Sequence, residues 1–145
     1  MPNHKLKASC HCGRIRLDLE LSRPPESYSP RACDCDFCRK HGAAYLSDAA
    51  GALRIYVKDV DALSKYRQGS DLADCLFCRY CGVLLGVAYQ DGAQLYAVIN
   101  SRVIDGGICF AEPTSVSPKT LAASEKVGRW KAVWFADVVL ILEPA

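Results

Sequence analysis

The stretch SCHCGRIRLDLEL, residues 9–21, contains the two features that decide the fold. It begins with a Cys-x-Cys-Gly cluster formed by residues 10–13. Strict alternation follows, with Ile15, Leu17 and two further leucines on one side and charged residues on the other. A period of two indicates a half-buried β-strand. We therefore expect such a strand to start directly after a candidate metal-binding cluster.

The composition is that of a single globular domain over residues 1–145. Half of the residues are apolar and 23% are charged, which is typical of a folded chain rather than a disordered one. The net charge is only +2, and no run of Lys and Arg forms the basic patch that nucleic-acid binding requires. We therefore expect no nucleic-acid partner.

The cysteines indicate a reducing compartment. The N-terminal sequence MPNHKLKASC has no apolar stretch after its basic residues, so we expect no signal peptide. The longest apolar run near the end, VVLIL at 138–142, is too short to span a membrane. We expect a cytoplasmic protein without a membrane partner, in which clustered cysteines bind metal. The odd count of nine cysteines also argues against a fully paired disulfide set.

The remaining patterns predict a mainly β fold. Residues 43–58 predict two strands around Gly51, and residues 83–100 predict a hairpin with its turn at Gln90-Asp91-Gly92. The last apolar segment, residues 132–143, predicts a final strand buried on both faces.

A single segment favours a helix. In SPKTLAASEKVGRW, residues 117–130, Ser117 can cap the helix, Pro118 suits its first position and Gly128 can end it. The architecture is therefore mainly β with little helix.

Two cysteine clusters end in glycine and together offer a complete tetrahedral sulfur set. They contribute Cys10 and Cys12 from the first cluster, and Cys78 and Cys81 from the third. A glycine after the second ligand permits the tight turn that directs both sulfurs at one ion. The alternatives are that these are buried core thiols or, for the third cluster, a redox pair. A redox pair normally lies in a βαβ unit, which is missing here.

The middle cluster has three cysteines, Cys33, Cys35 and Cys38. Catalytic zinc keeps three protein ligands and leaves its fourth position for water or substrate. The alternative is a closed site, in which Cys75 or His41 supplies the fourth ligand.

Charged residues lie within and after the middle cluster. Asp34 and Asp36 fit a solvated loop better than a pair of catalytic acids. Arg39 and Lys40 either meet a substrate carboxylate or are solvated surface charges, and His41 is also a candidate general base.

The three clusters together resemble the glutathione-dependent formaldehyde-activating enzyme family, which shares its domain with centromere protein V. The matching stretches are SCHCGRIRL (9–17), CDCDFCRKHGA (33–43) and FCRYCGVLL (77–85). The later LYAVINSRVID (95–105) is similar to the strand that follows the hairpin in the family. The resemblance covers about residues 5–106.

The resemblance implies a zinc-bound β-tent of small antiparallel sheets and two Zn²⁺ ions per chain. Structural zinc would be bound by Cys10, Cys12, Cys78 and Cys81, and catalytic zinc by Cys33, Cys35 and Cys38. The implied activity is that of a carbon–sulfur lyase acting on a small thiol adduct such as S-hydroxymethylglutathione, so that glutathione is an expected partner. The rival function is a non-enzymatic zinc-binding module that binds another protein.

Two departures from the family pattern concern the substrate. Many members carry an arginine where Cys75 stands in this chain. Residues 107–127 also differ from the usual end of the family, where a histidine-containing stretch precedes a tryptophan. Trp130 is the candidate for that tryptophan, but no histidine follows His41. Both departures fall where a substrate could be recognised.

Overall fold

The computed structural model describes residues 4–67 and 71–143, which form two β-sheets. The four-stranded sheet has the order β1-β2-β5-β11. Its strands are β1 (His4–Ser9), β2 (Ile15–Leu21), β5 (Ala52–Val57) and β11 (Asp137–Leu142). The seven-stranded sheet has the order β10-β3-β4-β9-β8-β7-β6. Its strands are β3 (Arg31–Cys33), β4 (Tyr45–Leu46), β6 (Leu63–Tyr66), β7 (Asp74–Cys78), β8 (Leu84–Asp91), β9 (Gln94–Asn100) and β10 (Thr114–Val116).

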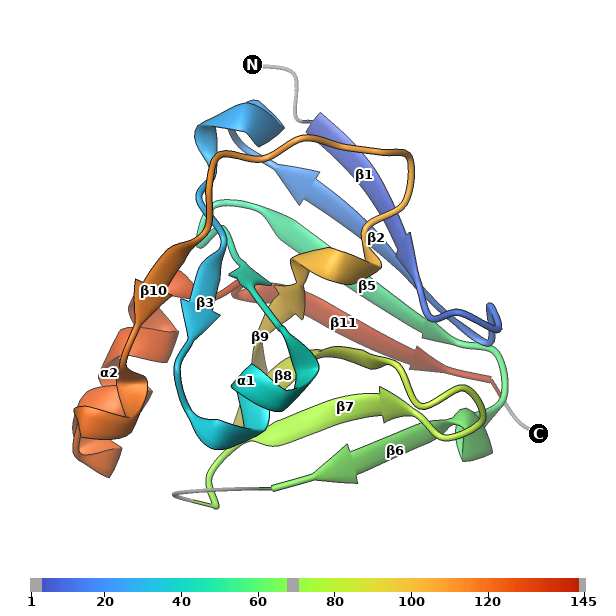
Figure 1. Ribbon diagram of the computed structural model, residues 1–145. Helices are drawn as coiled ribbons and strands as arrows, with labels where there is room; N and C mark the ends of the chain where they lie inside the picture. The colour runs from blue at the N-terminus through green and yellow to red at the C-terminus, as the bar shows by residue number, and fades with distance from the viewer. Residues whose placement is uncertain (1–3, 68–70, 144–145) are drawn as a thin grey trace.

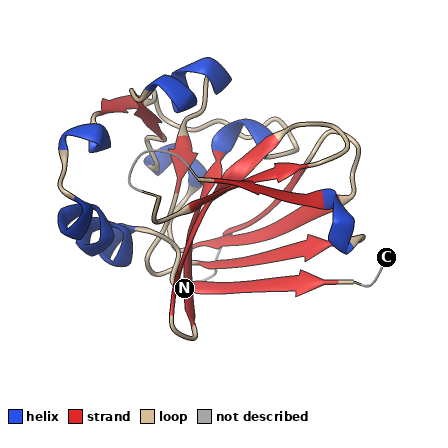
Figure 2. Ribbon diagram, turned by 90° about the horizontal axis from the view of Figure 1, so that it is seen from below, coloured by secondary structure: helices blue, strands red, loops and turns tan. Residues whose placement is uncertain are grey.

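Helix is sparse in the described chain and lies mostly to one side of the sheets (Figures 1 and 2). The α-helices are α1 (Asp36–His41) and α2 (Ala123–Val133), and short 3₁₀ turns cover Pro25–Ser27, Val60–Ala62, Ser101–Val103 and Pro118–Thr120. None of the helices among the described residues is long and apolar enough to cross a membrane. The prediction of a mainly β fold with little helix is confirmed. The pairing is mostly antiparallel, but β3–β10 and β5–β11 are parallel.

The alternating strand lies where its pattern predicted. Ile15, Leu17, Leu19 and Leu21 are at most 1% exposed, and the charged residues between them face outward. Strand β2 pairs with both β1 and β5. Phe135 is fully buried in the same core, which lies between the two sheets. Burial of this set supplies the main hydrophobic driving force for folding.

A buried carboxylate joins three loops at one end of this core. Asp48 accepts hydrogen bonds from the Ser22 N–H, the Ser22 hydroxyl and the Tyr28 hydroxyl at 2.6–2.7 Å, and from the Ala50 N–H at 2.9 Å. Burial alone would raise the pKa of Asp48, but these hydrogen bonds outweigh it and hold the pKa below its ordinary value.

The hairpin and the two strands around Gly51 are confirmed. Strands β8 and β9 pair in register from Gly86↔Ile99 to Asp91↔Gln94. Gly92 has φ +58°, the left-handed conformation that a tight turn requires.

The predicted bounds of the helix are wrong. Helix α2 starts at Ala123 rather than at Pro118, because the chain makes a separate 3₁₀ turn and is then extended at Leu121. The Glu125 carboxylate accepts a hydrogen bond from the Ala122 N–H, which caps the helix start. Gly128 lies inside the helix rather than at its end.

The last strand is also shorter than predicted and is not buried on both faces. It begins at Asp137, and its side chains alternate between exposed and half-buried. Val139 and Leu142 are 42% and 48% exposed, because β11 is an edge strand of the four-stranded sheet.

Candidate metal centres and the adjoining cavity

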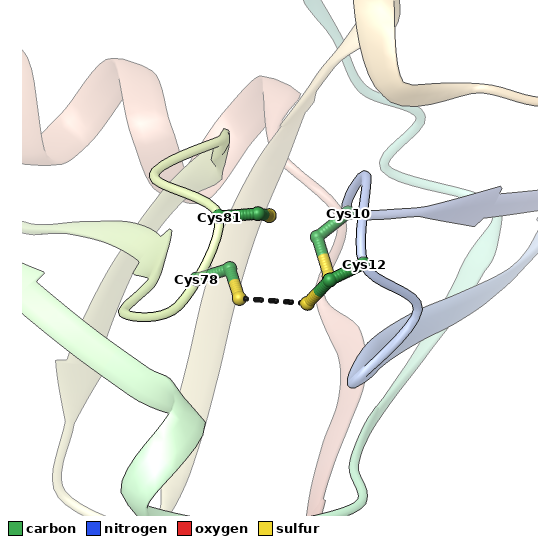
Figure 3. A group of neighbouring side chains, drawn as sticks. All are labelled: Cys10, Cys12, Cys78 and Cys81. Carbon is green, nitrogen blue, oxygen red and sulfur yellow. Dashed lines mark hydrogen bonds between the residues drawn. The ribbon is translucent and has the colours of Figure 1, made fainter.

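Two loops distant in sequence bring four cysteines together (Figure 3). Cys10 and Cys12 follow β1, whereas Cys78 ends β7 and Cys81 lies in the turn after it. Their four sulfur atoms all lie within 4.8 Å of one another. The Sγ atom of Cys12 is 3.7 Å from that of Cys10 and 3.5 Å from that of Cys78. The sequence prediction that these four residues share one site agrees with this geometry.

Each of the two loops turns on its glycine. Gly13 has φ +82° and Gly82 has φ +78°, values that side-chain-bearing residues rarely adopt. Each glycine N–H donates to the carbonyl of the first cysteine in its cluster. The Ile15 N–H donates to Cys10 Sγ at 3.4 Å, the kind of outer hydrogen bond that orients a metal-binding thiolate.

A cation lies beside this group. Hydrogen bonds from the Arg14 backbone and side chain lower the pKa of Cys12 to about 6. The Arg14 guanidinium also lies 4.3 Å from the centre of the Tyr80 ring, which fixes its position. Burial raises the pKa of Cys78 to about 12. Arg14 therefore favours the charged form of the exposed Cys12 thiol, whereas Cys10 and Cys78 are buried and Cys81 is half-buried.

The second group is built on one short segment. Cys33 ends β3, Cys35 is the N-cap of α1, and Cys38 lies inside that helix. Their three sulfur atoms also lie within 4.8 Å of one another. The Cys38 N–H donates to Cys35 Sγ at 3.4 Å, so the helix start itself orients one sulfur. The helix ends at Gly42, which adopts φ +61°.

The thiols of the second group differ in their environments. The hydrogen bond from Cys38 lowers the pKa of Cys33 to about 6. The same contact and burial raise the pKa of Cys38. The Tyr45 hydroxyl lies 3.1 Å from Cys38 Sγ, and burial raises the pKa of Tyr45, so this hydroxyl stays protonated.

Neither alternative fourth ligand joins the three sulfurs. Cys75 lies in the same cavity wall, but its sulfur is not within 4.8 Å of all three. Burial, followed by the charges of neighbouring cysteines, raises the pKa of Cys75 to about 12. His41 is exposed, and its ring lies 4.8 Å from that of Phe37 and 5.6 Å from that of Phe77. His41 does not line the cavity, so its geometry gives no support to a role as general base.

A cavity of about 410 Å³ opens beside the three-cysteine group. Apolar and aromatic side chains form much of its wall, including Val87, Val98, Trp130 and Trp134. The two tryptophan rings stack with centroids 4.9 Å apart. The volume is within the range of small-molecule sites.

The cations of the cavity are not the ones that the sequence suggested. Arg39 and Lys40 are exposed on α1 and do not line it. The lining cations are Arg31, Lys119, Lys126 and Arg129. A signal for Arg31 was present, because it lies two residues before Cys33 in β3 and alternate residues of a strand share a face. No local pattern indicated the other three, since they come from the C-terminal segment.

The two aspartates of the middle cluster have different surroundings. Asp36 is exposed as expected, but it begins α1 rather than lying in a loop. Asp34 instead accepts a hydrogen bond from the Ser117 hydroxyl and lies 3.9 Å from the Lys119 ammonium. Its second carboxylate oxygen is buried without a hydrogen-bond partner. Asp34 therefore joins the middle cluster to the C-terminal segment.

Both cysteine groups fit zinc. Thiolates at about 2.3 Å from a tetrahedral zinc ion lie about 3.8 Å from one another. The sulfur separations of 3.5 and 3.7 Å in the four-cysteine group are close to that value. The donor set, all cysteine sulfur, is one that zinc accepts in structural sites.

Comparison with known proteins gives one family and two relatives. A family model described as "Glutathione-dependent formaldehyde-activating enzyme" matches residues 5–121. An uncharacterized lyase of Schizosaccharomyces pombe is 26% identical over 117 residues, which cover 76% of this chain and 80% of that protein. A crystal structure of a Rhodobacter sphaeroides protein is 28% identical, with a TM-score of 0.55 over 70% of this chain and 89% of that one.

The matched range contains both cysteine groups and ends before α2 begins. At the level of the family, these similarities support a glutathione-related lyase or activating role. The resemblance noted on the cysteine clusters is thereby confirmed, and this chain belongs to the glutathione-dependent formaldehyde-activating enzyme family.

Proposed function

We propose that this chain, as one domain over residues 1–145, is a zinc-dependent carbon–sulfur lyase. Its substrate would be the adduct of a small thiol and an aldehyde, such as S-hydroxymethylglutathione. The observation that carries the proposal is that three clustered cysteines open into a cavity of ligand size. The four-cysteine group, in contrast, does not line this cavity.

The two groups would have different roles. Cys10, Cys12, Cys78 and Cys81 would hold a structural zinc ion, because they link two loops distant in sequence. Cys33, Cys35 and Cys38 would hold a catalytic one, which supplies a position where a substrate thiol is kept deprotonated near neutral pH.

The reaction needs no oxidant or reductant. In the cleavage direction the carbon–sulfur bond breaks, the hydroxyl oxygen loses its proton as the carbonyl forms, and the sulfur gains a proton. The apolar wall, which includes Val87, Val98 and Trp134, would exclude bulk water from the reacting carbon. The Tyr45 hydroxyl, which stays protonated, can donate to Cys38 Sγ and hold that side chain in place.

The rival function is a zinc-binding module that recognises another protein. It required a closed middle site, with Cys75 as the fourth ligand. Cys75 is not part of the sulfur group and faces the cavity instead. This geometry favours the enzyme.

Exchange NMR on glutathione and formaldehyde tests the proposal. The uncatalysed addition is already detectable, so the measured quantity is the exchange rate with and without protein. We expect a rate increase that Cys35→Ala abolishes and that Cys109→Ala retains, since Cys109 is an exposed cysteine outside both groups. An unchanged rate with the zinc-loaded wild-type protein would contradict the proposal for glutathione.

A further inference from the structure

The charges on the cavity wall are unbalanced. Four of its described lining residues are cations and none carries a carboxylate. Lys119 has a partner nearby in Asp34, at 3.9 Å. For Arg31, Lys126 and Arg129, no carboxylate of the described residues lies within ion-pair distance. The cavity wall therefore presents three positive charges that have no carboxylate partner among the described residues.

The lack of an ion-pair partner is not shared by every cation on helix α2. Lys131 lies on α2 but outside the cavity, and its ammonium contacts the Asp91 carboxylate at 2.5 Å. Lys7 and Arg54 of the four-stranded sheet also pair with aspartates. Exposed cations such as Arg39 and Lys40 have no ion pair with a described residue either, but they are solvated on α1. What distinguishes the cavity is that its unpaired cations line one wall whose described residues include no carboxylate.

Arg31 is the most constrained of the three. Its guanidinium donates to the Ser47 hydroxyl at 2.6 Å, and that hydroxyl donates to the Val133 carbonyl at the end of α2 at 2.8 Å. One of five N–H donors is thus used within the described protein. Arg31 is half-buried, and Arg129 lines the same cavity. A half-buried guanidinium beside a second cation is costly unless an anion compensates it.

Most of this charged wall belongs to the part of the chain that the family model does not match. Lys126, Arg129 and both tryptophans lie on or directly after α2, beyond residue 121. Residues of α2 and of β3, the strand that carries Arg31, line the same cavity. Helix α2 therefore adds charged and aromatic side chains to a cavity whose cysteines lie within the range that the family model matches.

We propose that Arg31, Lys126 and Arg129 form an anion-binding subsite, and that the thiol accepted by this chain carries a carboxylate that binds there. The assignment of the ligand as a thiol rests on the proposed function; the anion-binding subsite does not. The stacked Trp130 and Trp134 rings cover the apolar part of the ligand between the carboxylate and the sulfur. Helix α2 is thus a specificity element.

Both tryptophans of the chain line the cavity, so intrinsic fluorescence reports its occupancy. The zinc-loaded protein is titrated with S-methylglutathione, which keeps both carboxylates but has no free thiol. The matched probe is the diethyl ester of S-methylglutathione, which removes both charges. Calorimetry on the same pair gives the dissociation constants independently. We expect the acid to bind at least ten-fold more tightly than the ester.

Variants of Arg129, which is exposed, and of Lys126, which is half-buried, avoid the buried core. Arg129→Gln should weaken binding of the acid about ten-fold, the usual effect of losing one charge-assisted contact, and should leave the ester unchanged. Lys126→Gln combined with Arg129→Gln should weaken it further. The control, Lys131→Gln, makes the same charge change on the same helix outside the cavity, and should affect neither probe.

The outcomes separate the subsite from the lyase reaction. Equal affinity for acid and ester, no binding of the acid, or equal effects of Arg129→Gln and Lys131→Gln would overturn the subsite, whatever the lyase assay shows. Charge-dependent binding without faster exchange of glutathione and formaldehyde would support the subsite and sink the proposed lyase function alone.

Discussion

Replacing Cys12 by alanine should destabilise the whole chain far more than replacing Cys35. Each substitution removes one sulfur from one candidate zinc site. The difference arises from the length of chain that each site closes. Cys12 and Cys78 are 66 residues apart, whereas Cys33 and Cys38 are only five apart.

The loop lengths give the magnitude. The loop-closure expression for a cross-link gives about 4 kcal/mol for a loop of the first length and about 2 kcal/mol for the second. Domains of this kind are stable by roughly 5–15 kcal/mol in total. Since about 1 kcal/mol shifts the melting temperature by roughly 2–4 °C at this size, Cys12→Ala should lower it by about 8–16 °C. Cys35→Ala should lower it by about half as much.

Thermal unfolding followed by circular dichroism measures this difference, and atomic emission gives the zinc content of each variant. Cys109→Ala is the control for a cysteine substitution as such, because Cys109 is exposed and belongs to neither group. We expect one zinc ion fewer in each cluster variant and two in the control. A folded Cys12→Ala variant that keeps its full zinc content would refute the four-cysteine site. Equal melting temperatures for both variants would refute the argument from loop length.

Three further perturbations have defined outcomes. Mild chelation should remove about one zinc equivalent with little change in circular dichroism; loss of both ions together with unfolding would contradict a division into two kinds of site. Asp48→Asn should cost about 1.5–3 kcal/mol in urea unfolding at pH 7. The folded state lowers the pKa of Asp48. The stabilisation by its carboxylate is therefore present above the unfolded pKa of about 3.9 and is lost as the pH falls through the folded value. A stability difference between wild type and Asp48→Asn that does not change with pH would contradict this role of the carboxylate. Phe135→Ala should cost about 3–5 kcal/mol, since Phe135 is fully buried; a smaller cost would show that the core closes around the gap.

Local patterns in the sequence were enough for β2, for the strands around Gly51, for the β8–β9 hairpin and for the grouping of the cysteines. The alternation of residues 15–21 requires one buried face, and β2 has it. The turn at Gly92 and the glycines after Cys12 and Cys81 require positive φ, and all three adopt it. These features depend on neighbours in the chain, so a single sequence contains the information.

Features that depend on distant contacts were missed or misplaced. Ser117 was expected to cap the helix, but its hydroxyl donates to Asp34, 83 residues earlier in the chain. The last strand was expected to be buried on both faces, yet its place at a sheet edge leaves Val139 42% exposed. The cavity cations were missed because Arg31 and Arg129 belong to segments that only the tertiary fold brings together.

Under the proposed function, the separation of the two cysteine groups would let the same fold accept different substrates. The four-cysteine group joins the loops after β1 and β7, which belong to different sheets. The three-cysteine group lies on one short segment, and the opposite wall of its cavity is supplied by α2. Substitutions at Lys126 or Arg129 change the charge of that wall without touching either group of sulfurs or the core. Substrate choice can therefore vary through the C-terminal helix while the metal-binding framework stays the same.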